Sequence, residues 1–293
     1  MKKKIDRCGI ILAGGSGTRL APITQSISKQ LLPVYNKPMI YYPLSTLMTA
    51  KIRNILIISD PKNINIYKDL LGNGKHIGIK LNYKVQKKPR GLSEAFVLGK
   101  KFIGNRKVVL ILGDNIFYGD NLKEKLIKAA SSNENIIFGY RVKDPQRYGV
   151  AKINKKGRLE SIIEKPKISP SNIAITGMYF YNNDVVKRVT ELKYSKRGEL
   201  EITDLNNIYI KNNNLNLYTL GSETAWLDTG TFQSLSDASM FVMAIENRTG
   251  KLVSSPEKIS YLNKWINKKQ LLSIAKSYKN DYGEKLNIID ENY

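Results

Sequence analysis

Residues 12–20, LAGGSGTRL, begin at the end of the short apolar run GIIL at residues 9–12. An apolar run that ends in glycines predicts a buried strand followed by a tight turn. Glycine has no Cβ, so the backbone of such a turn can approach a phosphate chain and point its N–H groups at it. Arg19 in the turn and Lys29 beyond it can neutralise the charge that develops during phosphate transfer. The stretch predicts a nucleotide-binding turn, with a glycine turn that binds nothing as the alternative.

Three well-known glycine patterns do not fit this stretch. The P-loop requires lysine after its last glycine, but Gly17 is followed by Thr18. The dinucleotide-binding fingerprint requires a third glycine where Leu20 stands. The nucleophile elbow requires glycine two residues after Ser16, where the chain has Thr18. If the turn binds phosphate, it does so through a pattern other than these three, and a glycine turn without a ligand remains the alternative.

The composition excludes several classes of protein. Hydrophobic residues make up 42% of the 293 residues and charged residues 25%, which is typical of a globular protein and not of a disordered one. No apolar run approaches the roughly 20 residues needed to span a bilayer, and the run after the basic residues 2–4 is too short for a signal peptide. Cys8 is the only cysteine, so an intrachain disulfide is excluded. We expect a cytoplasmic protein that does not associate with a membrane.

The net charge of +23 does not by itself identify a partner. Such a charge is compatible with nucleic acid, with a phosphorylated small molecule, or with a solvated surface alone. The lysines are spread along the whole chain, and no nucleic-acid-binding motif is present. We expect no nucleic-acid partner. A basic nucleic-acid-binding protein is kept as an alternative, which a steep salt dependence of DNA or RNA binding would support.

The chain offers little material for nucleophilic catalysis or zinc binding. Its one histidine, His76, lies in the loop-like sequence GKHIG, and Cys8 precedes the first expected strand. We expect an exposed loop histidine and a small buried cysteine. A Cys–His or Ser–His mechanism and a zinc site are therefore unexpected.

Apolar runs alternate with helical patterns through the first half of the chain. The expected strands cover residues 10–12, 55–59, 81–85 and 108–112, and the expected helices cover residues 39–51, 64–71, 92–103 and 122–131. This alternation predicts an α/β fold, a Rossmann-like, mostly parallel sheet flanked by helices. Ligands of such sheets bind at the carboxyl ends of the strands, where both the glycine turn and GDN at residues 113–115 are expected.

The second half of the chain has a different pattern. Short β-like runs at residues 148–154, 158–164 and 173–181, with a turn at Gly157, predict a β-rich insertion that lies over the sheet. Helices then resume at about residues 201–211 and 232–246. A C-terminal helical segment follows at residues 247–293, as a subdomain or an interface.

Two aspartates are candidates for a metal site. Asp114 follows a buried apolar run, which is a common position for a Mg²⁺ ligand, but an Asx-turn or a helix-capping aspartate fits equally well. Asp228 is a second candidate, and it could instead cap the helix expected from Phe232. The spacing of the two residues does not indicate that they meet in space.

Seven blocks of sequence stand in order along nearly the whole chain: LAGGSGTRLAPIT (12–24) with KQLLPV (29–34), KPMIYYPL (37–44), GDN (113–115), RYGV (147–150), EKP (164–166), RGELEITD (197–204) and WLDTGT (226–231). Together they resemble the sugar-1-phosphate nucleotidylyltransferases, and within that family the members that transfer a thymidylyl group. The resemblance implies a Mg²⁺-dependent reaction of dTTP with glucose 1-phosphate. Its products would be dTDP-glucose, the first intermediate of dTDP-rhamnose synthesis, and pyrophosphate.

The resemblance also implies the roles of individual residues. It implies that Gly14, Gly15, Gly17 and Thr18 bind the nucleotide and its phosphates. It also implies that Gln86 and Gly91 recognise the edge of the thymine base. It places Arg19 on the pyrophosphate leaving group, Lys29 on the reacting phosphates, and Mg²⁺ on Asp114 and Asp228.

The sugar phosphate is assigned to a second set of residues. The resemblance places Lys165 and Arg197 on its phosphate, and it lines the sugar pocket with Tyr148, Gly149, Glu164, Ile175 and Tyr179. For Glu164 an exposed carboxylate at a strand end is the alternative. The implied organisation is a nucleotidyltransferase domain at residues 1–246, with a nucleotide-binding part at about 1–132 and a sugar-binding part at about 133–230. The C-terminal helical segment at 247–293 would then be an interface or a regulatory region.

The base-reading segment QKKPRGLSEA, residues 86–95, departs from the family pattern. Gln86, Pro89 and Gly91 match it, whereas Ser93 and Glu94 stand where relatives often have alanine and glutamine. The departure predicts a slight change of base preference. The nearest alternative is a uridylyltransferase or another sugar-1-phosphate nucleotidylyltransferase, and a more distant one is an inactive nucleotide-sugar-binding regulator. Relatives are homotetramers, so we expect the same assembly here.

Overall fold

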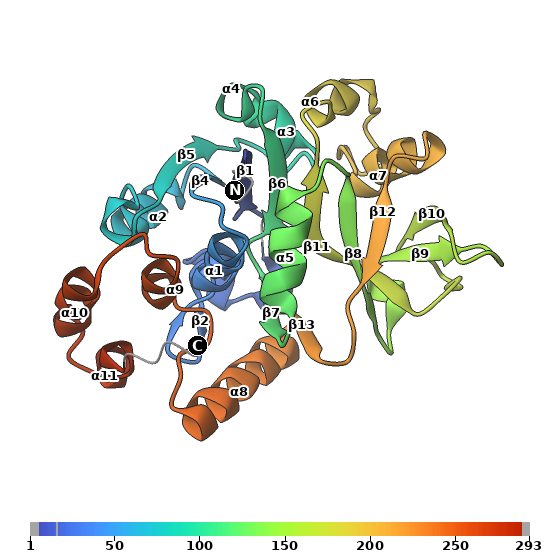
Figure 1. The fold of residues 1–293 in the computed structure, drawn as a ribbon. Helices are drawn as coiled ribbons and strands as arrows, with labels where there is room; N and C mark the ends of the chain where they lie inside the picture. Colours follow the sequence, from blue (N-terminus) through green and yellow to red (C-terminus); the bar gives the residue numbers. More distant parts are fainter. Residues whose placement is uncertain (1–5, 16, 289–293) are drawn as a thin grey trace.

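The computed structural model describes residues 6–15 and 17–288 of the chain (Figure 1). Within these residues the strands form a nine-stranded sheet of order β10-β9-β11-β6-β1-β4-β5, with β8 added at β11 and β12 added at β8. Its strands are β1 (Arg7–Leu12), β4 (Asn54–Ser59), β5 (Lys80–Val85), β6 (Lys107–Leu112), β8 (Ile136–Arg141), β9 (Gly149–Ile153), β10 (Leu159–Glu164), β11 (Ile173–Tyr181) and β12 (Asn216–Thr219).

Helices lie on both faces of this sheet. Their bounds are α1 (Tyr41–Thr49), α2 (Ile64–Leu71), α3 (Glu94–Leu98), α4 (Lys100–Ile103), α5 (Leu122–Ser131), α6 (Val185–Arg188), α7 (Ile202–Lys211), α8 (Phe232–Thr249), α9 (Pro256–Leu262), α10 (Lys268–Ser277) and α11 (Asp281–Asn287). Buried side chains of α1, α2 and α5 join Ile11 of β1 in one core cluster. Those of α3, α4, α6 and α7 join Ile10 and Leu12 in another. Because successive side chains of β1 enter opposite cores, the strand has no polar residue after Arg7.

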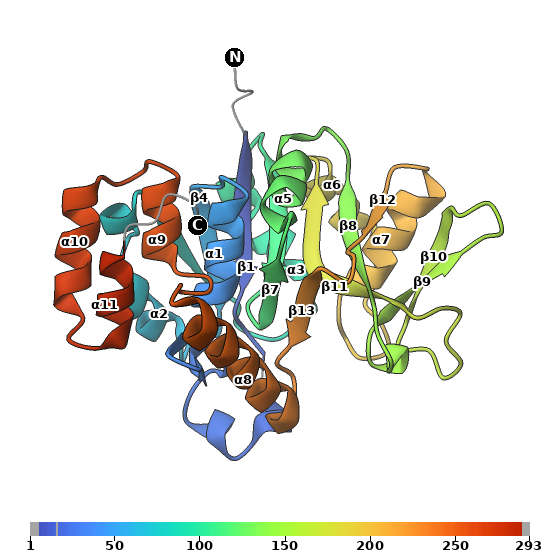
Figure 2. The ribbon, with the colours of Figure 1, turned by 60° about the horizontal axis from the view of Figure 1, so that its bottom comes forward.

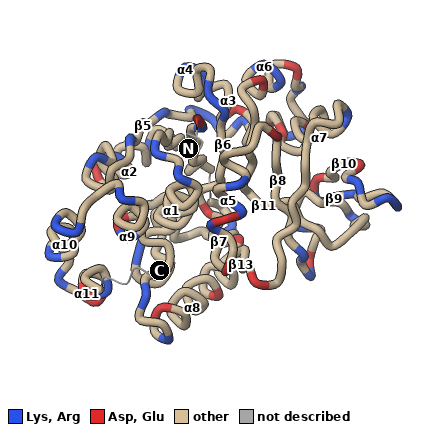
Figure 3. Tube along the Cα trace, viewed as in Figure 1, with Lys and Arg blue, Asp and Glu red and all other residues tan. Residues whose placement is uncertain are grey.

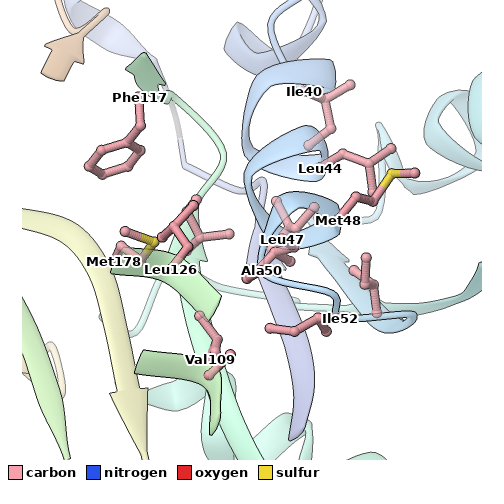
Figure 4. Close-up of a cluster of buried hydrophobic side chains, with 14 of the residues drawn as sticks. Ile40, Leu44, Leu47, Met48, Ala50, Ile52, Val109, Phe117, Leu126 and Met178 are labelled. Atoms are coloured by element: carbon pink, nitrogen blue, oxygen red, sulfur yellow. The ribbon is translucent and has the colours of Figure 1, made fainter. Parts of the chain in front are cut away.

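The core beneath α1 is typical of this packing. Leu44, Leu47 and Met48 of α1 belong to one buried cluster with Val109 of β6 and Met178 of β11, and Leu47 lies on the side of α1 towards these strands (Figure 4). These buried side chains hold α1 against the middle of the sheet, beside the strands whose ends carry the site.

The predicted parallel half of the sheet is confirmed. The four predicted runs lie within β1, β4, β5 and β6, and β1 pairs in parallel with both β4 and β6. The helices predicted at residues 64–71 and 122–131 coincide with α2 and α5. The helix predicted at 92–103 is divided at Gly99, where an added Cβ would lie 2.9 Å from Ile10 Cδ1. The chain passes so close to the sheet at this point that a single regular helix is interrupted.

The sequence predicted that the β-rich segment lies over the sheet, and this prediction is wrong. The segment instead extends the sheet. β11 pairs antiparallel with β6, and it also pairs antiparallel with β8 and β9. Residues 173–181 are buried throughout, so they act as a central strand that joins the parallel half to the antiparallel half. β9 and β10 lie at one end of the molecule in Figures 1 and 2, with the turn at Gly157 between them.

A short ribbon outside the main sheet was not predicted. β7 (Asn115–Gly119) pairs antiparallel with β13 (Thr224–Asp228), and Asn115 stands opposite Asp228. β7 follows β6 after a two-residue turn. The ribbon therefore brings residue 228 beside the carboxyl end of β6.

The C-terminal helices α9, α10 and α11 lie beside α1 and α2, at the end of the molecule opposite β9 and β10 (Figures 1 and 2). A buried ion pair connects this region to the core: Lys37 Nζ lies 2.8 Å from Glu246 Oε1, and both side chains are almost fully buried. Lys285 of α11 approaches the same glutamate. The tail is helical, as expected, although residues 289–293 lie outside the described part.

Basic residues are distributed over many helices and loops in the view of Figure 3, and they do not form one block. This agrees with a solvated charged surface. In the described part of the chain, none of the helices combines the length and the apolar character needed to cross a membrane.

Candidate active site

The glycine turn follows β1 at the carboxyl edge of the parallel strands, as predicted. Gly15 has φ +112° and Gly17 has φ +58°, conformations that side chains rarely adopt. The Thr24 hydroxyl donates to the carbonyl of Gly17 at 2.8 Å and fixes the turn from the far side. Thr18 and Arg19 begin the 3-10 helix η1 (Thr18–Leu20), while Ser16 lies outside the described residues.

Lys29 and Asp114 form the central contact of the site. Lys29 is buried in the 3-10 helix η3 (Lys29–Leu31), and its Nζ lies 2.5 Å from Asp114 Oδ2. Asn115 Nδ2 donates to the other carboxylate oxygen of Asp114 at 2.9 Å. Burial alone would raise the pKa of Asp114, but the charge and hydrogen bond of Lys29 hold it below its usual value. The strand β7, and not a helix, follows Asp114, so its carboxylate does not cap a helix.

Asp228 lies beside this pair, so the two aspartates do meet. The β7–β13 pairing carries it there, and the Thr229 hydroxyl donates to the backbone carbonyl of Asp114 at 2.9 Å. Burial raises the pKa of Asp228, and the charge of Asp114 raises it further. The cap of α8 is Thr231, whose side chain accepts from the N–H of Ser234, so the helix-cap interpretation of Asp228 is wrong.

Two arginines approach Asp228. Arg147 Nη2 lies 3.6 Å from Asp228 Oδ2. A Cβ at Gly230 would lie 3.1 Å from Asp228 Oδ1 and 3.4 Å from Arg19 Nη1, so this glycine leaves room for both groups. Two carboxylates and three cations thus face one another at the end of β6.

Three adjoining cavities open around the glycine turn. The first has a volume of about 250 Å³ and is lined by Gly15, Lys29 and Gln86, among others. The second, of about 200 Å³, contains the glycine turn with Arg19, Lys29 and Asp114. The third, of about 440 Å³, lies towards β11. Its lining includes every residue predicted for the sugar phosphate: Tyr148, Gly149, Glu164, Lys165, Ile175, Tyr179 and Arg197.

The charged groups of the third cavity are held by neighbouring acids and hydroxyls. Thr203 Oγ1 donates to Glu164 Oε2 at 2.7 Å. The guanidinium of Arg197 donates from both Nε and Nη2 to Glu201. The side chain of Arg197 is 49% exposed and that of Lys165 is 53% exposed. Lys165 has φ +41°, a strained backbone of the kind that clusters at functional sites.

Gln86 and Gly91, predicted to read the base, lie in different surroundings. Gln86 is buried at the end of β5, and its Oε1 would be 3.2 Å from a Cβ at Gly14. Gly91 has φ +96° and packs against the backbone of Leu200, where a Cβ would come within 2.6 Å of the Leu200 nitrogen. The backbone packing alone accounts for glycine at this position.

Several residues that line the third cavity were not predicted. Asn115 Oδ1 accepts from Gly177 N at 2.9 Å and from Trp226 Nε1 at 2.7 Å, so it joins β7, β11 and β13 behind Asp114. The Trp226 ring packs against Tyr148 with a centroid separation of 5.1 Å. The sequence signal for Asn115 was its place next to Asp114, but its contacts depend on strand pairing that the sequence does not reveal.

His76 and Cys8 behave as expected. His76 is exposed in the short 3-10 helix η4 (Lys75–Ile77) and lines none of the three cavities. Cys8 is fully buried in β1, and burial raises the pKa of its thiol to about 11. Neither side chain is available to the site as a nucleophile or a base.

A nucleotidyl transferase family model matches residues 8–245 of the chain. The glucose-1-phosphate thymidylyltransferase of Neisseria meningitidis is 49% identical over 280 residues, which cover 95% of this chain and 97% of that protein. The corresponding enzyme of Mycobacterium tuberculosis is 50% identical over 279 residues, with the same shares of the two chains. The chain belongs to the glucose-1-phosphate thymidylyltransferases of the nucleotidyl transferase family.

Solved structures agree with this membership. A Bacillus anthracis protein assigned as a glucose-1-phosphate thymidylyltransferase, in complex with sucrose, matches with a TM-score of 0.74 and 40% identity over 80% of this chain and 94% of its own. A UDP-glucose pyrophosphorylase in complex with UDP-glucose matches with a TM-score of 0.71 and 25% identity over 83% and 100% of the two chains. This member of the family is accordingly a nucleotidyltransferase with the family's α/β fold.

Proposed function

We propose that the chain transfers a thymidylyl group from dTTP to glucose 1-phosphate, giving dTDP-glucose and pyrophosphate as the first step of dTDP-rhamnose synthesis. One observation carries the proposal. The Lys29–Asp114 pair, with Arg19 and Asp228, stands where the cavity of the glycine turn meets the larger cavity towards β11. An arrangement of this kind suits two anionic substrates that must react end to end.

The reaction requires alignment of the two substrates more than proton transfer. A phosphate oxygen of glucose 1-phosphate forms a bond to the α-phosphorus of dTTP, and the bond from that phosphorus to the bridging oxygen of the β-phosphate breaks. The attacking oxygen is already anionic near neutral pH, so no general base is needed. This fits a chain in which His76 is exposed and Cys8 is sealed in the core.

On the nucleotide side, we assign the phosphates to backbone N–H groups of the glycine turn, formed by Gly14, Gly15, Gly17 and Thr18. Arg19 would neutralise the leaving pyrophosphate, and Lys29 the reacting phosphates. Gln86 would accept a hydrogen bond from the base. Gly91 would support the segment, residues 86–95, that recognises the base.

On the sugar side, Lys165 and Arg197 would bind the phosphate of glucose 1-phosphate. Glu164, held by Thr203, is suited to accept hydrogen bonds from sugar hydroxyls. Tyr148, Gly149, Ile175 and Tyr179 would line the sugar pocket. These roles divide the domain into a nucleotide-binding part at about residues 1–132 and a sugar-binding part at about 133–230, followed by the C-terminal segment from 247.

Asp114 and Asp228 fit a Mg²⁺ ion. The described residues contain no group of three or more potential ligands, but Mg²⁺ is commonly held by one or two carboxylates together with substrate phosphates and water. Burial raises the pKa of Asp228 and the charge of Asp114 raises it further, and a divalent cation would relieve the repulsion between the two carboxylates. When bound, the ion would supply positive charge to the phosphates during displacement.

A uridylyltransferase remains the second candidate, because the fold also matches a UDP-glucose pyrophosphorylase. Thymine and uracil differ by one methyl group, which discriminates by only about 1–3 kcal/mol, so some use of UTP is expected. We also propose a cytoplasmic homotetramer. The single buried cysteine agrees with that location. The exposed Phe232, Met240 and Met243 along α8 supply an apolar surface for assembly.

The proposed function is tested by measuring pyrophosphate release over a grid of nucleoside triphosphates and sugar 1-phosphates, with and without Mg²⁺. We expect the highest rate with dTTP and glucose 1-phosphate, and a loss of activity when the metal is chelated. A clear preference for UTP would overturn the assigned base. Binding of nucleotide sugars without any turnover would favour an inactive regulator.

A further inference from the structure

A buried contact fixes the side chain of Gln86 at the end of β5. The residue is 6% exposed, and its backbone N–H donates to the carbonyl of Ser59 at 2.8 Å. Its side-chain Nε2 lies 2.7 Å from Oε2 of Glu94, the first residue of α3. The backbone and the amide nitrogen of Gln86 are therefore both held from within the protein.

This contact decides which end of the Gln86 amide faces the nucleotide. A carboxylate only accepts hydrogen bonds, so the group that meets Glu94 must be the amide nitrogen. The carbonyl oxygen Oε1 then lies on the side of Gly14, where a Cβ would be 3.2 Å away. Because residue 14 is glycine, Oε1 is not covered by a side chain there. It is presented as an acceptor beside the cavity that Gln86 shares with Gly15.

We propose that Glu94 is a positioning residue that selects pyrimidine bases with a hydrogen on N3, by holding Gln86 with its carbonyl oxygen towards the base. The inference rests on the proposed function, and it goes further by naming the device that sets base choice. Thymine and uracil carry N3–H, which donates to Oε1. The second hydrogen of the Gln86 amide is left for the O4 acceptor of the same base.

Cytosine presents the opposite pattern, an N3 acceptor and an N4 donor. To read it, the Gln86 amide must turn over, which brings its carbonyl oxygen against the Glu94 carboxylate. Two acceptors then face each other in a partly buried place, and the charge-assisted hydrogen bond is lost. Glu94 thus acts by excluding the wrong amide orientation and does not itself touch the base.

The test compares Glu94→Gln and Glu94→Ala with the unaltered chain. A glutamine at 94 can donate as well as accept, and an alanine does neither, so both variants permit the turned-over amide. For each protein kcat/KM is measured with dTTP, UTP and dCTP at saturating glucose 1-phosphate. The KM for glucose 1-phosphate and the melting temperature are recorded alongside. Glu124→Gln, at an exposed position on α5, is the matched control.

We expect the unaltered chain and Glu124→Gln to prefer dTTP and UTP over dCTP. In Glu94→Ala this preference should fall by roughly tenfold to a hundredfold. In Glu94→Gln it should fall less, because the glutamine carbonyl can still accept a hydrogen bond from the Gln86 amide. The KM for glucose 1-phosphate should be unchanged in both variants. If the folded variants keep the original ratio of dTTP to dCTP, the role of Glu94 is overturned and the proposed function stands. If the unaltered chain releases no pyrophosphate from dTTP, or prefers a purine nucleotide, both proposals fail.

Discussion

The two sides of the site hold their cations differently. On the nucleotide side, Lys29 has a side chain only 8% exposed and is fixed by Asp114 at 2.5 Å. On the sugar side, Arg197 and Lys165 are about half exposed, and Lys165 Nζ is 3.8 Å from its neighbour Glu164. A buried cation acts on developing charge in surroundings of low dielectric constant, whereas water weakens the field of a half-exposed cation. We infer that the buried cation of the nucleotide side acts mainly on turnover, and that the exposed cations of the sugar side act mainly on substrate binding.

The largest expected effect is that of Asp114→Asn, which removes the partner of Lys29 and one proposed Mg²⁺ ligand. The amide has nearly the shape of the carboxylate, so the fold should persist, while kcat should fall by about 10³-fold. Pyrophosphate release gives kcat, and circular dichroism and thermal melting check the fold. Asp69→Asn, at an exposed position on α2, is the control. Unchanged turnover in Asp114→Asn would remove this residue from the metal site.

Lys29→Gln tests the nucleotide side of the comparison. The substitution deletes a buried positive charge beside the reacting phosphates, so kcat should fall by about 10²-fold. The KM for glucose 1-phosphate should change much less. Steady-state kinetics with both substrates varied separates the two effects, and the exposed Lys100→Gln serves as the control. A change confined to KM would contradict the contrast between the two sides.

Arg197→Gln tests the sugar side. Loss of an exposed guanidinium should raise the KM for glucose 1-phosphate by about tenfold through a lost charge-assisted contact. Because Glu201 would lose its ion pair and keep, among the described residues, only the hydrogen bond from Ser195, Glu201→Gln is the companion variant. In it Arg197 keeps its charge but loses its carboxylate partner. The comparison fails if Arg197→Gln lowers kcat as strongly as Lys29→Gln does.

Arg147→Gln should move the pH dependence of the reaction. Arg147 lies 3.6 Å from Asp228 and opposes the rise in the pKa of that carboxyl, so its removal should raise this pKa further. A protonated Asp228 cannot hold Mg²⁺, and activity is lost as the pH falls through its pKa. In the pH profile of kcat/KM, measured at limiting Mg²⁺, the acid limb should therefore shift to higher pH. The shift should be less than about one pH unit, because the Arg147–Asp228 pair is partly exposed. A shift to lower pH would contradict the assignment.

The smallest effect on catalysis is expected for Met240→Glu on α8. A charge on this exposed apolar face should dissociate the proposed tetramer while each subunit keeps most of its turnover. Light scattering gives the assembly state, with Ile66→Glu on α2 as a matched exposed substitution. A tetramer that survives Met240→Glu would place the interface elsewhere.

The two halves of the sheet also differ in how far the sequence predicted them. β1, β4 and β6 are buried on both faces, so each appears as a short apolar run, and Asp114 could be placed at a strand end from that pattern alone. β8 and β12 were not predicted. The apolar run of β8, residues 136–138, is short and ends at Gly139, and β12 mixes apolar and polar residues over only four positions.

The pairing of the two aspartates shows the same limit at the site itself. Asp228 reaches Asp114 only through the register of β13 on β7, a pairing between segments far apart in the chain. Nothing local to either segment encodes that register, and the contacts of Arg147 and Asn115 depend on it as well. Residue types were therefore predictable from the motifs, whereas their mutual distances required the fold.

The central claim is that two anions are aligned for a single displacement with no covalent intermediate on the protein. The most direct measurement is the stereochemical outcome at the α-phosphorus, using dTTP with a chiral α-thiophosphate and analysing the configuration of the dTDP-glucose product. One in-line displacement predicts inversion. Retention of configuration would require two successive displacements through a nucleotidylated side chain, and would contradict the account.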